Sequence, residues 1–398
     1  MIKDKYVLFT RIPLIRNSEG RFFCDDLWAK DLILHLDYIS RLMLCCPIID
    51  SENISNLVCI SDYRIEKIFP LKQDYGIVSV IQNLVPNFIG VIKACKEADI
   101  CHSGGAGWAF PLSFYLLLLR PLLKFQWIIV IESSFWMLSE NQKKTARNII
   151  EHYSYTWILR LCLWWADARI FTQSFYKKYF IGNSNERTLV APAIWVNESD
   201  ILSLNDFNEK WLNTARKVPE LIFPSRLIED KGVFVLFQAI EHLKKQNCSV
   251  NITIMGDGAL KEKCQIFCQQ DFGSVKVQYR NPVNYGQDFF SVLREYDAVL
   301  VCNLKEEQPR IIFDAFSQGL PVIASDTSGI LDIVNKKNSL IFQDGDSLSL
   351  AQKIQEIVEQ LKILEQMGQE ALKYIDGKNH HQMHIDRFNF LNSTLKIS

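Results

Sequence analysis

Two cations follow a short apolar run in the second half of the chain. Arg226 and Lys231 lie in the stretch FPSRLIEDKG, directly after the run at 220–225. A guanidinium fork and a lysine point charge near the end of a strand are suited to hold a diphosphate. The alternative is that both are surface cations, one of them paired with Glu229 or Asp230. Spacing alone leaves both interpretations open.

The strongest chemical signal is the stretch KEEQPRIIFDAFSQGLPVIAS at 305–325. Pro309 suits the first position of a helix, and Gly319 suits the position just after its end. We therefore expect a helix N-terminus at 309–311, following the apolar run at 297–302. The free amides of such an end attract phosphate or sugar hydroxyls.

Two carboxylates accompany this helix. Glu306 lies just before it, and Asp314 lies on its second turn. Ionised carboxylates only accept hydrogen bonds, so the two are suited to bind a row of hydroxyls, as on ribose or hexose. The alternative is a solvated acidic loop with an Arg310–Asp314 ion pair.

Two further loops contain glycine and small polar residues. In MGDGAL, Gly256 and Gly258 flank Asp257 between an expected strand and helix. The third glycine of the dinucleotide fingerprint is missing, so this loop predicts a turn that could also admit a ligand close to the backbone. The loop SDTSGI at 325–330 offers hydroxyl and amide donors, or caps the next helix.

Composition bounds the class of protein. The 398 residues include 44 lysines and arginines and 45 aspartates and glutamates, without the basic excess of a nucleic-acid binder. A hydrophobic content of 48% and a charged content of 22% are ordinary for a soluble globular protein, and the length favours two domains. Eleven cysteines without a CxxC pair favour structural thiols in a reducing, cytoplasmic compartment over a disulfide framework.

Strand-like and helix-like segments alternate from end to end. The expected strands are 6–10, 57–60, 98–103, 126–133, 168–174, 220–225, 250–256, 275–280, 297–302, 321–325 and 339–342. Near-continuous apolar strands that alternate with helices indicate parallel sheets covered on both faces. We therefore expect an α/β fold of two doubly wound Rossmann-like domains. Ligands bind such sheets beyond the carboxyl ends of the strands, where the residues above lie.

Three segments bear on membranes. The N-terminal apolar run ends at Arg11, too early for a signal peptide. The run PLSFYLLLL at 111–119 is shorter than the roughly 20 residues of a spanning helix and predicts a buried helix, with interfacial contact as the alternative. In the segment 141–166 one helical stripe carries Ile150, Tyr153, Trp157, Leu161 and Trp164. Core packing is the expected use of this stripe, and a membrane face is the alternative.

The motifs RLIEDKG, ITIMGDG and EEQPRIIFDAFSQGLPVIASDTSG, in this order, resemble the donor half of the retaining family 4 glycosyltransferases, also called glycosyl transferases group 1. The resemblance covers 220–360. It implies GT-B architecture, in which two domains face each other across a cleft. The acceptor-side domain is expected over 1–205 and the donor domain over 206–376. A final helix over 377–398 is expected to cross back onto the first domain. The punctuated stretch 191–208 marks the domain boundary.

The family signature is a pair of glutamates at the spacing of Glu306 and Asp314. Here the second place holds aspartate, which keeps the charge and loses one methylene. The resemblance implies that Arg226 and Lys231 neutralise the donor diphosphate and that Glu306 contacts hydroxyls of the transferred sugar. It implies that Asp314 accepts from the ribose hydroxyls. Further donor contacts are expected from Gly256, Asp257, Gly258, Arg310 and Ile311.

The first half resembles the family only loosely. Where the family carries paired glycines after the first strand, this chain offers Gly20 as a donor contact. Where the family often has a histidine that touches the sugar, Glu132 stands in WIIVIESSFW and is assigned to catalysis. His102, in DICHSGGAGW, is a second candidate for sugar or acceptor contact. The alternatives are that Glu132 caps the next segment and that His102 bonds within the core.

The implied reaction is transfer of a hexosyl-type sugar from a nucleotide diphosphate sugar to an acceptor hydroxyl, with retention at the anomeric carbon. Catalysis is expected to be electrostatic, without a protein nucleophile or a metal. His380 and His384 lie one helical turn apart, but acidic or cysteine partners are lacking nearby in the sequence, so no metal is expected there either.

Two alternatives stand beside this interpretation. One is a catalytically weak GT-B protein that binds sugar nucleotides or serves as a partner subunit, and the departures at Asp314 and Glu132 motivate it. The other is a different reaction on the same fold, such as epimerisation of a nucleotide sugar. The expected acceptor is a glycan, a lipid-linked or a small molecule, and peripheral contact of the N-terminal domain with the cytoplasmic face of a membrane is a further expectation.

Overall fold

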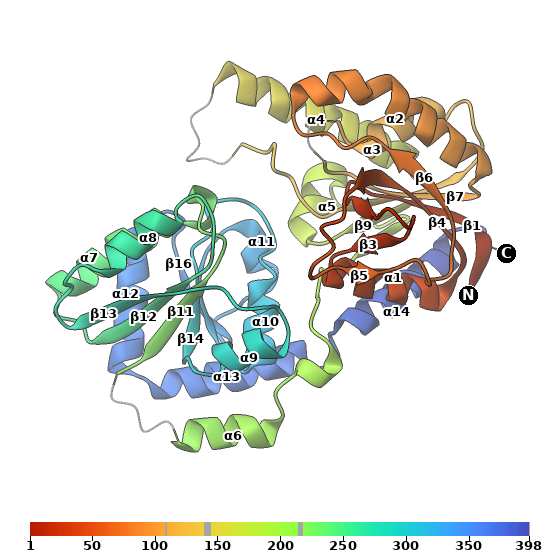
Figure 1. Cartoon of the computed structure of the whole chain (residues 1–398). Helices are drawn as coiled ribbons and strands as arrows, with labels where there is room; N and C mark the ends of the chain where they lie inside the picture. Colours follow the sequence, from red (N-terminus) through yellow and green to blue (C-terminus); the bar gives the residue numbers. More distant parts are fainter. Residues whose placement is uncertain (108–109, 139–144, 214–217, 398) are drawn as a thin grey trace. The chain divides into compact units, whose positions relative to one another are not determined.

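The computed structural model describes residues 1–107, 110–138, 145–213 and 218–397 (Figure 1). Within this part, the chain forms two compact units. Unit 1 takes in the described residues up to Pro192 together with the C-terminal segment from Met383. Unit 2 takes in those of Ala193–Gln382.

Unit 1 is built on one sheet with the strand order β10-β9-β8-β7-β1-β4-β2-β3-β5, and β6 pairs with β4 on the side. Parallel pairing joins β1 to β4 and β7, so Tyr6 lies between Leu42 and Ile100. The strands are β1 (Ile2–Phe9), β2 (Leu14–Arg16), β3 (Phe22–Cys24), β4 (Ile39–Asp50), β5 (Val58–Cys59), β6 (Ile65–Leu71), β7 (Ile100–Gly104), β8 (Gln126–Ile131), β9 (Ala168–Phe171) and β10 (Thr188–Val190).

Helices cover both faces of this sheet because alternate residues of its strands point to opposite sides. On β8, Ile129 and Ile131 join a core with α2 (Ile77–Glu97), α3 (Leu112–Leu119), α4 (Ala146–Trp165) and α5 (Ser174–Ile181). Ile128 and Val130 join the other core with α1 (Asp26–Tyr38) and α14 (His380–Thr394). Residues of the C-terminal helix α14 thus pack on the first unit.

Unit 2 has one parallel sheet in the order β13-β12-β11-β14-β15-β16. The strands are β11 (Glu220–Pro224), β12 (Val250–Met255), β13 (Val275–Arg280), β14 (Ala298–Val301), β15 (Val322–Ser325) and β16 (Ser339–Phe342). The helices are α6 (Leu204–Asn213), α7 (Val233–Lys245), α8 (Lys261–Cys268), α9 (Gln287–Leu293), α10 (Ile311–Ser317), α11 (Ser328–Leu331), α12 (Ser347–Glu359) and α13 (Lys362–Ile375), with short 3₁₀ turns η1 (Glu198–Asp200) and η2 (Glu229–Lys231). Separate cores lie on the two faces of the sheet.

The α/β fold of two Rossmann-like units is confirmed, and each expected strand overlaps an observed one. Five strands were not predicted: β2, β3, β4, β6 and β10. The long strand β4 starts directly after α1 without a turn, so no loop signal separates the two elements. The region expected to be a polar loop through Gly20 contains the hairpin of β2 and β3.

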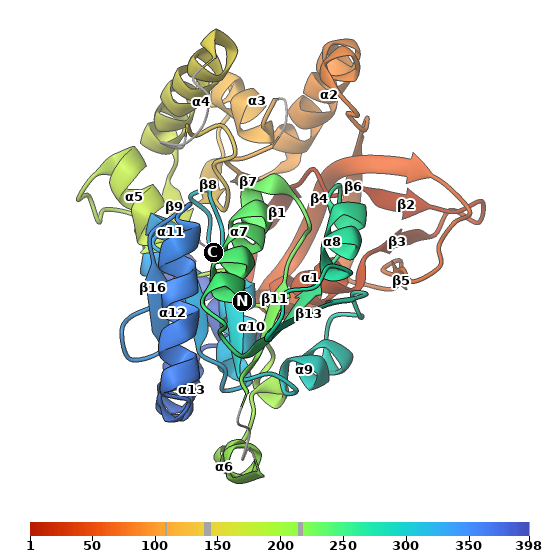
Figure 2. The same ribbon diagram turned by 90° about the vertical axis from the view of Figure 1, so that its left-hand side faces the viewer.

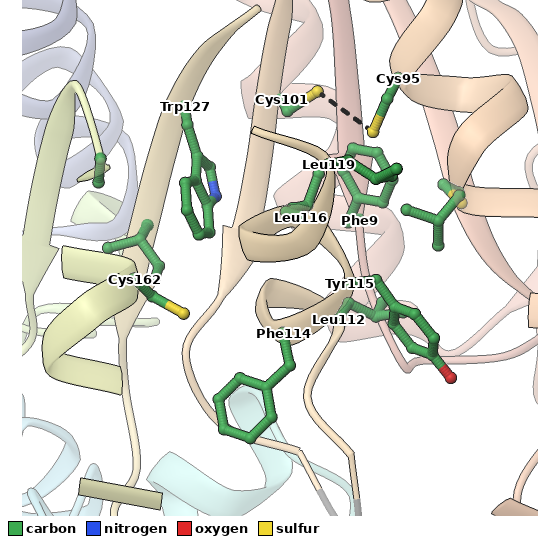
Figure 3. Close-up of a cluster of buried hydrophobic side chains, with 14 of the residues drawn as sticks. Phe9, Cys95, Cys101, Leu112, Phe114, Tyr115, Leu116, Leu119, Trp127 and Cys162 are labelled. Carbon is green, nitrogen blue, oxygen red and sulfur yellow. Dashed lines mark hydrogen bonds between the residues drawn. The ribbon is translucent and has the colours of Figure 1, made fainter. Parts of the chain in front are cut away.

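The two apolar helical segments of unit 1 have different fates. Helix α3 is buried, as predicted, and Figure 3 shows its Leu112, Leu116 and Leu119 among core side chains of the sheet and neighbouring helices. The prediction for α4 is wrong, because the stripe from Ile150 to Trp164 is exposed. The opposite face of α4, with Leu159 and Leu163, packs in the core instead.

Candidate functional site

The candidate site lies at the carboxyl edge of the unit 2 sheet, where β11 pairs with both β12 and β14. The chain leaves β11 toward β12 on one side, while β14 on the other side leads away toward β15. Such a reversal of strand order is the place where doubly wound sheets leave room for a ligand. The loops after β11 and β14 meet there, because the amide of Leu304 donates to the carbonyl of Asp230 at 2.9 Å.

Lys231 is brought to the β14 loop by the turn that precedes α7. The following residue, Gly232, has φ of +74°, and a Cβ there would collide with the carbonyl of Cys302. This close approach places the Lys231 ammonium in an ion pair with Glu307. Glu307 also accepts a hydrogen bond of 2.8 Å from the Asn303 amide. The sequence interpretation missed Glu307 as a site residue.

Glu306 connects the β14 loop to the loop after β15. Its carboxylate accepts from the Ser328 hydroxyl and from the Gly329 amide, both at 3.2 Å. Ser328 and Gly329 are the first residues of α11, whose orphan amides favour a negative charge. The stretch SDTSGI thus contacts Glu306, and its small polar residues fix the direction of that carboxylate.

Asp314 occupies a different environment from Glu306. It lies on α10 with only 5% of its surface exposed, and it accepts a hydrogen bond of 2.8 Å from the Tyr285 hydroxyl. Burial raises the pKa of Asp314 to about 7, against the lowering effects of the Tyr285 hydrogen bond and the Arg310 charge. The Arg310 guanidinium itself lies over the Trp195 ring, 5.2 Å from its centre. Tyr285 was not predicted, since no motif or period marks it.

Arg226 is exposed just beyond the end of β11. Of its two expected alternative partners, Asp230 pairs with Lys305 at 2.7 Å. The side chain of Arg226 therefore stands at the same sheet edge as Lys231, on the solvent side of the loop.

The glycines of the MGDGAL loop serve packing between loops. Gly256 and Gly258 have φ of +153° and +147°, and a Cβ on either would collide with carbonyl oxygens of the β11 loop, at Ser225 and Leu227. Asp257 points to solvent and pairs with Lys261 at 2.9 Å. The sequence predicts that a ligand could approach the backbone of these glycines. In the structure the β11 loop packs against them instead, and this contact holds the backbone on either side of Arg226.

In unit 1 the structure corrects the assignment of His102 to sugar contact. His102 is buried within β7, and its Nδ1 lies 2.6 Å from the Tyr6 hydroxyl. Burial lowers its pKa well below the ordinary value, and the positive neighbours add to this effect. A neutral histidine held inside the core matches the alternative interpretation.

The other two predicted residues of unit 1 lie at the surface. Glu132 is exposed and follows the carboxyl end of β8. Gly20 has φ of +79° at the tip of the β2–β3 hairpin, where its amide donates to the Asn17 carbonyl at 3.0 Å. The hairpin turn by itself accounts for this glycine.

The structure separates the two histidines considered as a metal half-site. His380 stacks on Trp195 in unit 2. His384 Nε2 lies 3.0 Å from the Asp31 carboxylate in unit 1, and His35 is beside them, so three potential metal ligands lie together. Burial lowers the pKa of His384 to about 3, although the hydrogen bond and charge of Asp31 act in the opposite direction. The contact between His384 and Asp31 links α14 to α1.

We compared the amino-acid sequence with known protein families. Residues 205–374 match the family Glycosyl transferases group 1. This match covers the part of the chain that carries the candidate site. The matched residues include all four loops described above, and the resemblance of the sequence motifs is thereby confirmed. Glu306 and Asp314 both lie within the matched residues.

Curated relatives match about half of this chain, and solved structures show its fold. Protein CapJ of Staphylococcus aureus is 24% identical over 199 residues, half of each chain. The capsular polysaccharide biosynthesis glycosyltransferase CapM of the same organism is 20% identical over 182 residues, 44% of this chain and 46% of CapM. This chain thus spans about half the length of these curated relatives. The structure of Anabaena HepE with UDP and glucose matches 98% of this chain and all of HepE, with 16% identity and a TM-score of 0.64. The fold around the group 1 domain is therefore GT-B.

Proposed function

We propose that this protein transfers a hexosyl-type sugar from a nucleotide diphosphate sugar to an acceptor hydroxyl, with retention at the anomeric carbon. The observation that carries the proposal is the placement of Lys231 and Glu306 on neighbouring loops at the switch point of a group 1 domain. One supplies positive charge for the diphosphate, and the other supplies an acceptor for sugar hydroxyls.

Lys231 has the environment that such a charge requires. Its side chain is only 13% exposed, and an electrostatic interaction is stronger there than in bulk water. When the glycosidic bond to the diphosphate breaks, negative charge grows on the leaving phosphate oxygen. A preorganised cation beside that oxygen stabilises the transition state more than the ground state. Arg226, exposed at the same sheet edge, adds a second cation.

The donor diphosphate takes the place of Glu307 as the partner of Lys231. In the ligand-free protein, the Glu307 carboxylate neutralises this lysine. The Glu307 side chain is 35% exposed and accepts a hydrogen bond from Asn303. It can therefore keep its position when the Lys231 ammonium turns toward the phosphate. Glu307 thus holds Lys231 in position before the donor arrives.

Tyr285 and Asp314 together contact the donor ribose. Aspartate is one methylene shorter than the glutamate of the family signature, and Asp314 is almost fully buried. The Tyr285 hydroxyl bonded to it belongs to a residue that is 37% exposed. In our proposal the Tyr285 hydroxyl extends toward the ribose, which the shorter carboxylate cannot contact by itself. A ribose hydroxyl then donates a hydrogen bond to the Tyr285 oxygen or to the Asp314 carboxylate.

The bonds of the reaction balance without a protein nucleophile. The bond from the anomeric carbon to the diphosphate oxygen breaks, and a bond to the acceptor oxygen forms on the same face of the sugar. The acceptor proton goes to the leaving diphosphate. The role of the chain is to bind and orient both substrates and to stabilise the charge, which Lys231 and Arg226 do in place of a metal.

The relatives narrow the choice of probes. The crystal structure of HepE contains UDP and glucose, so UDP-hexoses are the first donors to test. The name of CapM places it in capsular polysaccharide biosynthesis, which favours a glycan or glycan precursor as acceptor. A cytoplasmic location, where sugar nucleotides are available, fits the reduced thiols.

A second candidate function is a binding protein for sugar nucleotides with weak or no catalysis. The specific observation in its favour is that Lys231 and Asp314 are both engaged within the chain, with Glu307 and Tyr285. Both candidates use the same site, so binding alone does not separate them.

A thermal-shift screen against nucleotide diphosphates and their sugars tests both candidates. A ligand that binds only the folded protein stabilises it by RT ln(1 + [L]/Kd). We expect one base to raise Tm, with UDP tested first, and we expect slow hydrolysis of the matching sugar nucleotide that Glu306→Gln abolishes. Binding without hydrolysis or transfer would favour the second candidate. If no nucleotide diphosphate raises Tm, both fail.

A further inference from the structure

The first half of helix α2 carries an apolar face that the fold leaves uncovered. In the described part of the chain, α2 is the one helix long and apolar enough to cross a membrane by length and composition. Its exposed apolar side chains are 39–69% accessible and include Ile77, Val78, Ile81, Leu84, Val85 and Ile89.

Helix α4 carries a second face of the same kind. The exposed stripe consists of Ile150, Tyr153, Trp157, Leu161 and Trp164, with exposed fractions from 47% to 69%. This stripe faces away from the core and contains two tryptophans. Leaving these large side chains in water costs free energy, because each exposes apolar area that could otherwise be buried. Exposed apolar patches of this kind mark interaction sites.

The two faces belong to one layer of unit 1. Helix α3 contacts α2 on one side and α4 on the other, and Figures 1 and 2 show the three helices side by side over the same face of the sheet. Leu118 at the end of α3 and Leu122 just after it are exposed, at 57% and 76%. The apolar surface therefore runs over neighbouring helices, and we call it the α2–α4 face.

Helix α2 is fixed to unit 1 and does not leave it to span a bilayer. The Asn87 side chain bonds both the amide and the carbonyl of Lys72, at 2.7 and 3.2 Å. Gly90 lets the helix approach β6, where a Cβ would crowd Leu71. The second half of α2 buries Val91 and Cys95 in the core. The exposed face can therefore only lie along a surface.

The charges around this face are mostly positive. Exposed basic residues lie on α2, on α4 and on the segment after α3, at Lys93, Lys96, Lys124, Arg147 and Arg160. Of the acidic residues on α2 and α4, Glu97 pairs with Lys67 at 2.6 Å and Glu151 is half-buried. The exposed apolar stripe of α4 itself contains no carboxylate.

We propose that the α2–α4 face docks unit 1 on a membrane surface that contains anionic lipids. Tryptophan and tyrosine rings settle at the boundary between headgroups and acyl chains, and aliphatic side chains reach just below it. Lysine and arginine beside them attract anionic headgroups. The inference goes beyond the proposed transfer reaction and does not depend on it.

Vesicle flotation of the full-length protein tests the proposal without any donor or acceptor. We expect co-flotation with vesicles of phosphatidylcholine and phosphatidylglycerol, weaker binding to phosphatidylcholine alone, and weakening by salt. The double variant Trp157→Glu/Trp164→Glu should lower partitioning by at least about tenfold, since it removes two interfacial anchors and adds two negative charges. Ile81→Glu/Val85→Glu should do the same from α2.

A matched control introduces the same charges in unit 2. Ile266 on α8 and Leu348 on α12 are also exposed, so Ile266→Glu/Leu348→Glu should float like the wild type. All three double variants change exposed side chains and should keep the wild-type Tm. Equal flotation of the α4 variant and the control, or no flotation of the wild type, would overturn the proposal. A wild-type dimer that the α4 variant dissociates, with no vesicle binding, would assign this face to a second copy instead.

Discussion

The Tyr285 hydroxyl donates a hydrogen bond of 2.8 Å to the Asp314 carboxylate in unit 2, on the helix that follows the loop with Glu306. Asp314 is almost fully buried, and this burial raises its pKa to about 7. The site therefore contains a carboxyl group whose charge changes near neutral pH.

The raised pKa makes stability depend on pH in a definite direction. In the unfolded chain Asp314 loses its proton near the ordinary pKa of 3.8, but in the folded protein it keeps the proton up to about 7. The stabilisation that this proton gives is full below the lower value and is lost as pH rises through the higher one. Asp314→Asn cannot titrate, so its free energy of unfolding should fall less over this range.

Urea unfolding at several pH values measures this difference. Asp257→Asn is the control, because Asp257 is exposed and its pKa is lowered by Lys261, so it should not flatten the slope. An Asp314→Asn protein with the pH profile of the wild type would show that Asp314 ionises normally.

The wild type and Asp314→Asn also test the pH dependence of nucleotide binding. Affinity for a nucleotide diphosphate should fall below about pH 7 more steeply in the wild type, since the phosphate titrates equally in both.

Glu307→Gln should strengthen donor binding. The glutamine keeps an acceptor for the Asn303 amide but removes the negative charge that competes with the diphosphate for Lys231. We expect affinity for the nucleotide diphosphate to rise by about three- to tenfold, the effect of one charge pair near the surface. Titration calorimetry measures it, with Glu356→Gln on α12 as an exposed control. Weaker binding by Glu307→Gln would mean that Glu307 contacts the donor itself.

Much of this site could be predicted because local signals determine it. The alternation of apolar runs and helical patterns fixes which loops follow β11, β12, β14 and β15, and parallel pairing brings those loops to one edge. That rule places Lys231 and Glu306 at one edge of the sheet, but it does not identify the side-chain partners within the site. Tyr285 lies 29 residues before Asp314 in a loop without a period, and their contact depends on the path of α9 between them.

The exposed face of α4 shows a different limit. Periodicity identifies the stripe with Trp157 and Trp164, but the opposite stripe, with Leu159 and Leu163, is also apolar. A helix with two apolar sides does not indicate in sequence which one faces the sheet. The packing against α3 and the sheet decides this, and it leaves the bulkier tryptophans outside.

Transfer should be independent of divalent metal. If Lys231 and Arg226 neutralise the diphosphate, saturating EDTA should leave the transfer rate within about twofold of the untreated enzyme, since no step of the proposed reaction uses a metal. The measurement is release of nucleotide diphosphate from the sugar nucleotide with and without the chelator. Loss of activity that magnesium or manganese restores would contradict the assignment of the two cations.

The central claim is that Lys231 binds the diphosphate of the donor, and the most direct test compares a nucleotide diphosphate with its nucleoside. Titration calorimetry with UDP and uridine, or with the pair for whichever base stabilises the protein, is run on wild type and Lys231→Ala. We expect the wild type to prefer the diphosphate strongly and Lys231→Ala to reduce that preference by about ten- to a hundredfold, the loss of one charge-assisted contact, with nucleoside affinity and Tm nearly unchanged. The same preference in both folded proteins would contradict the account.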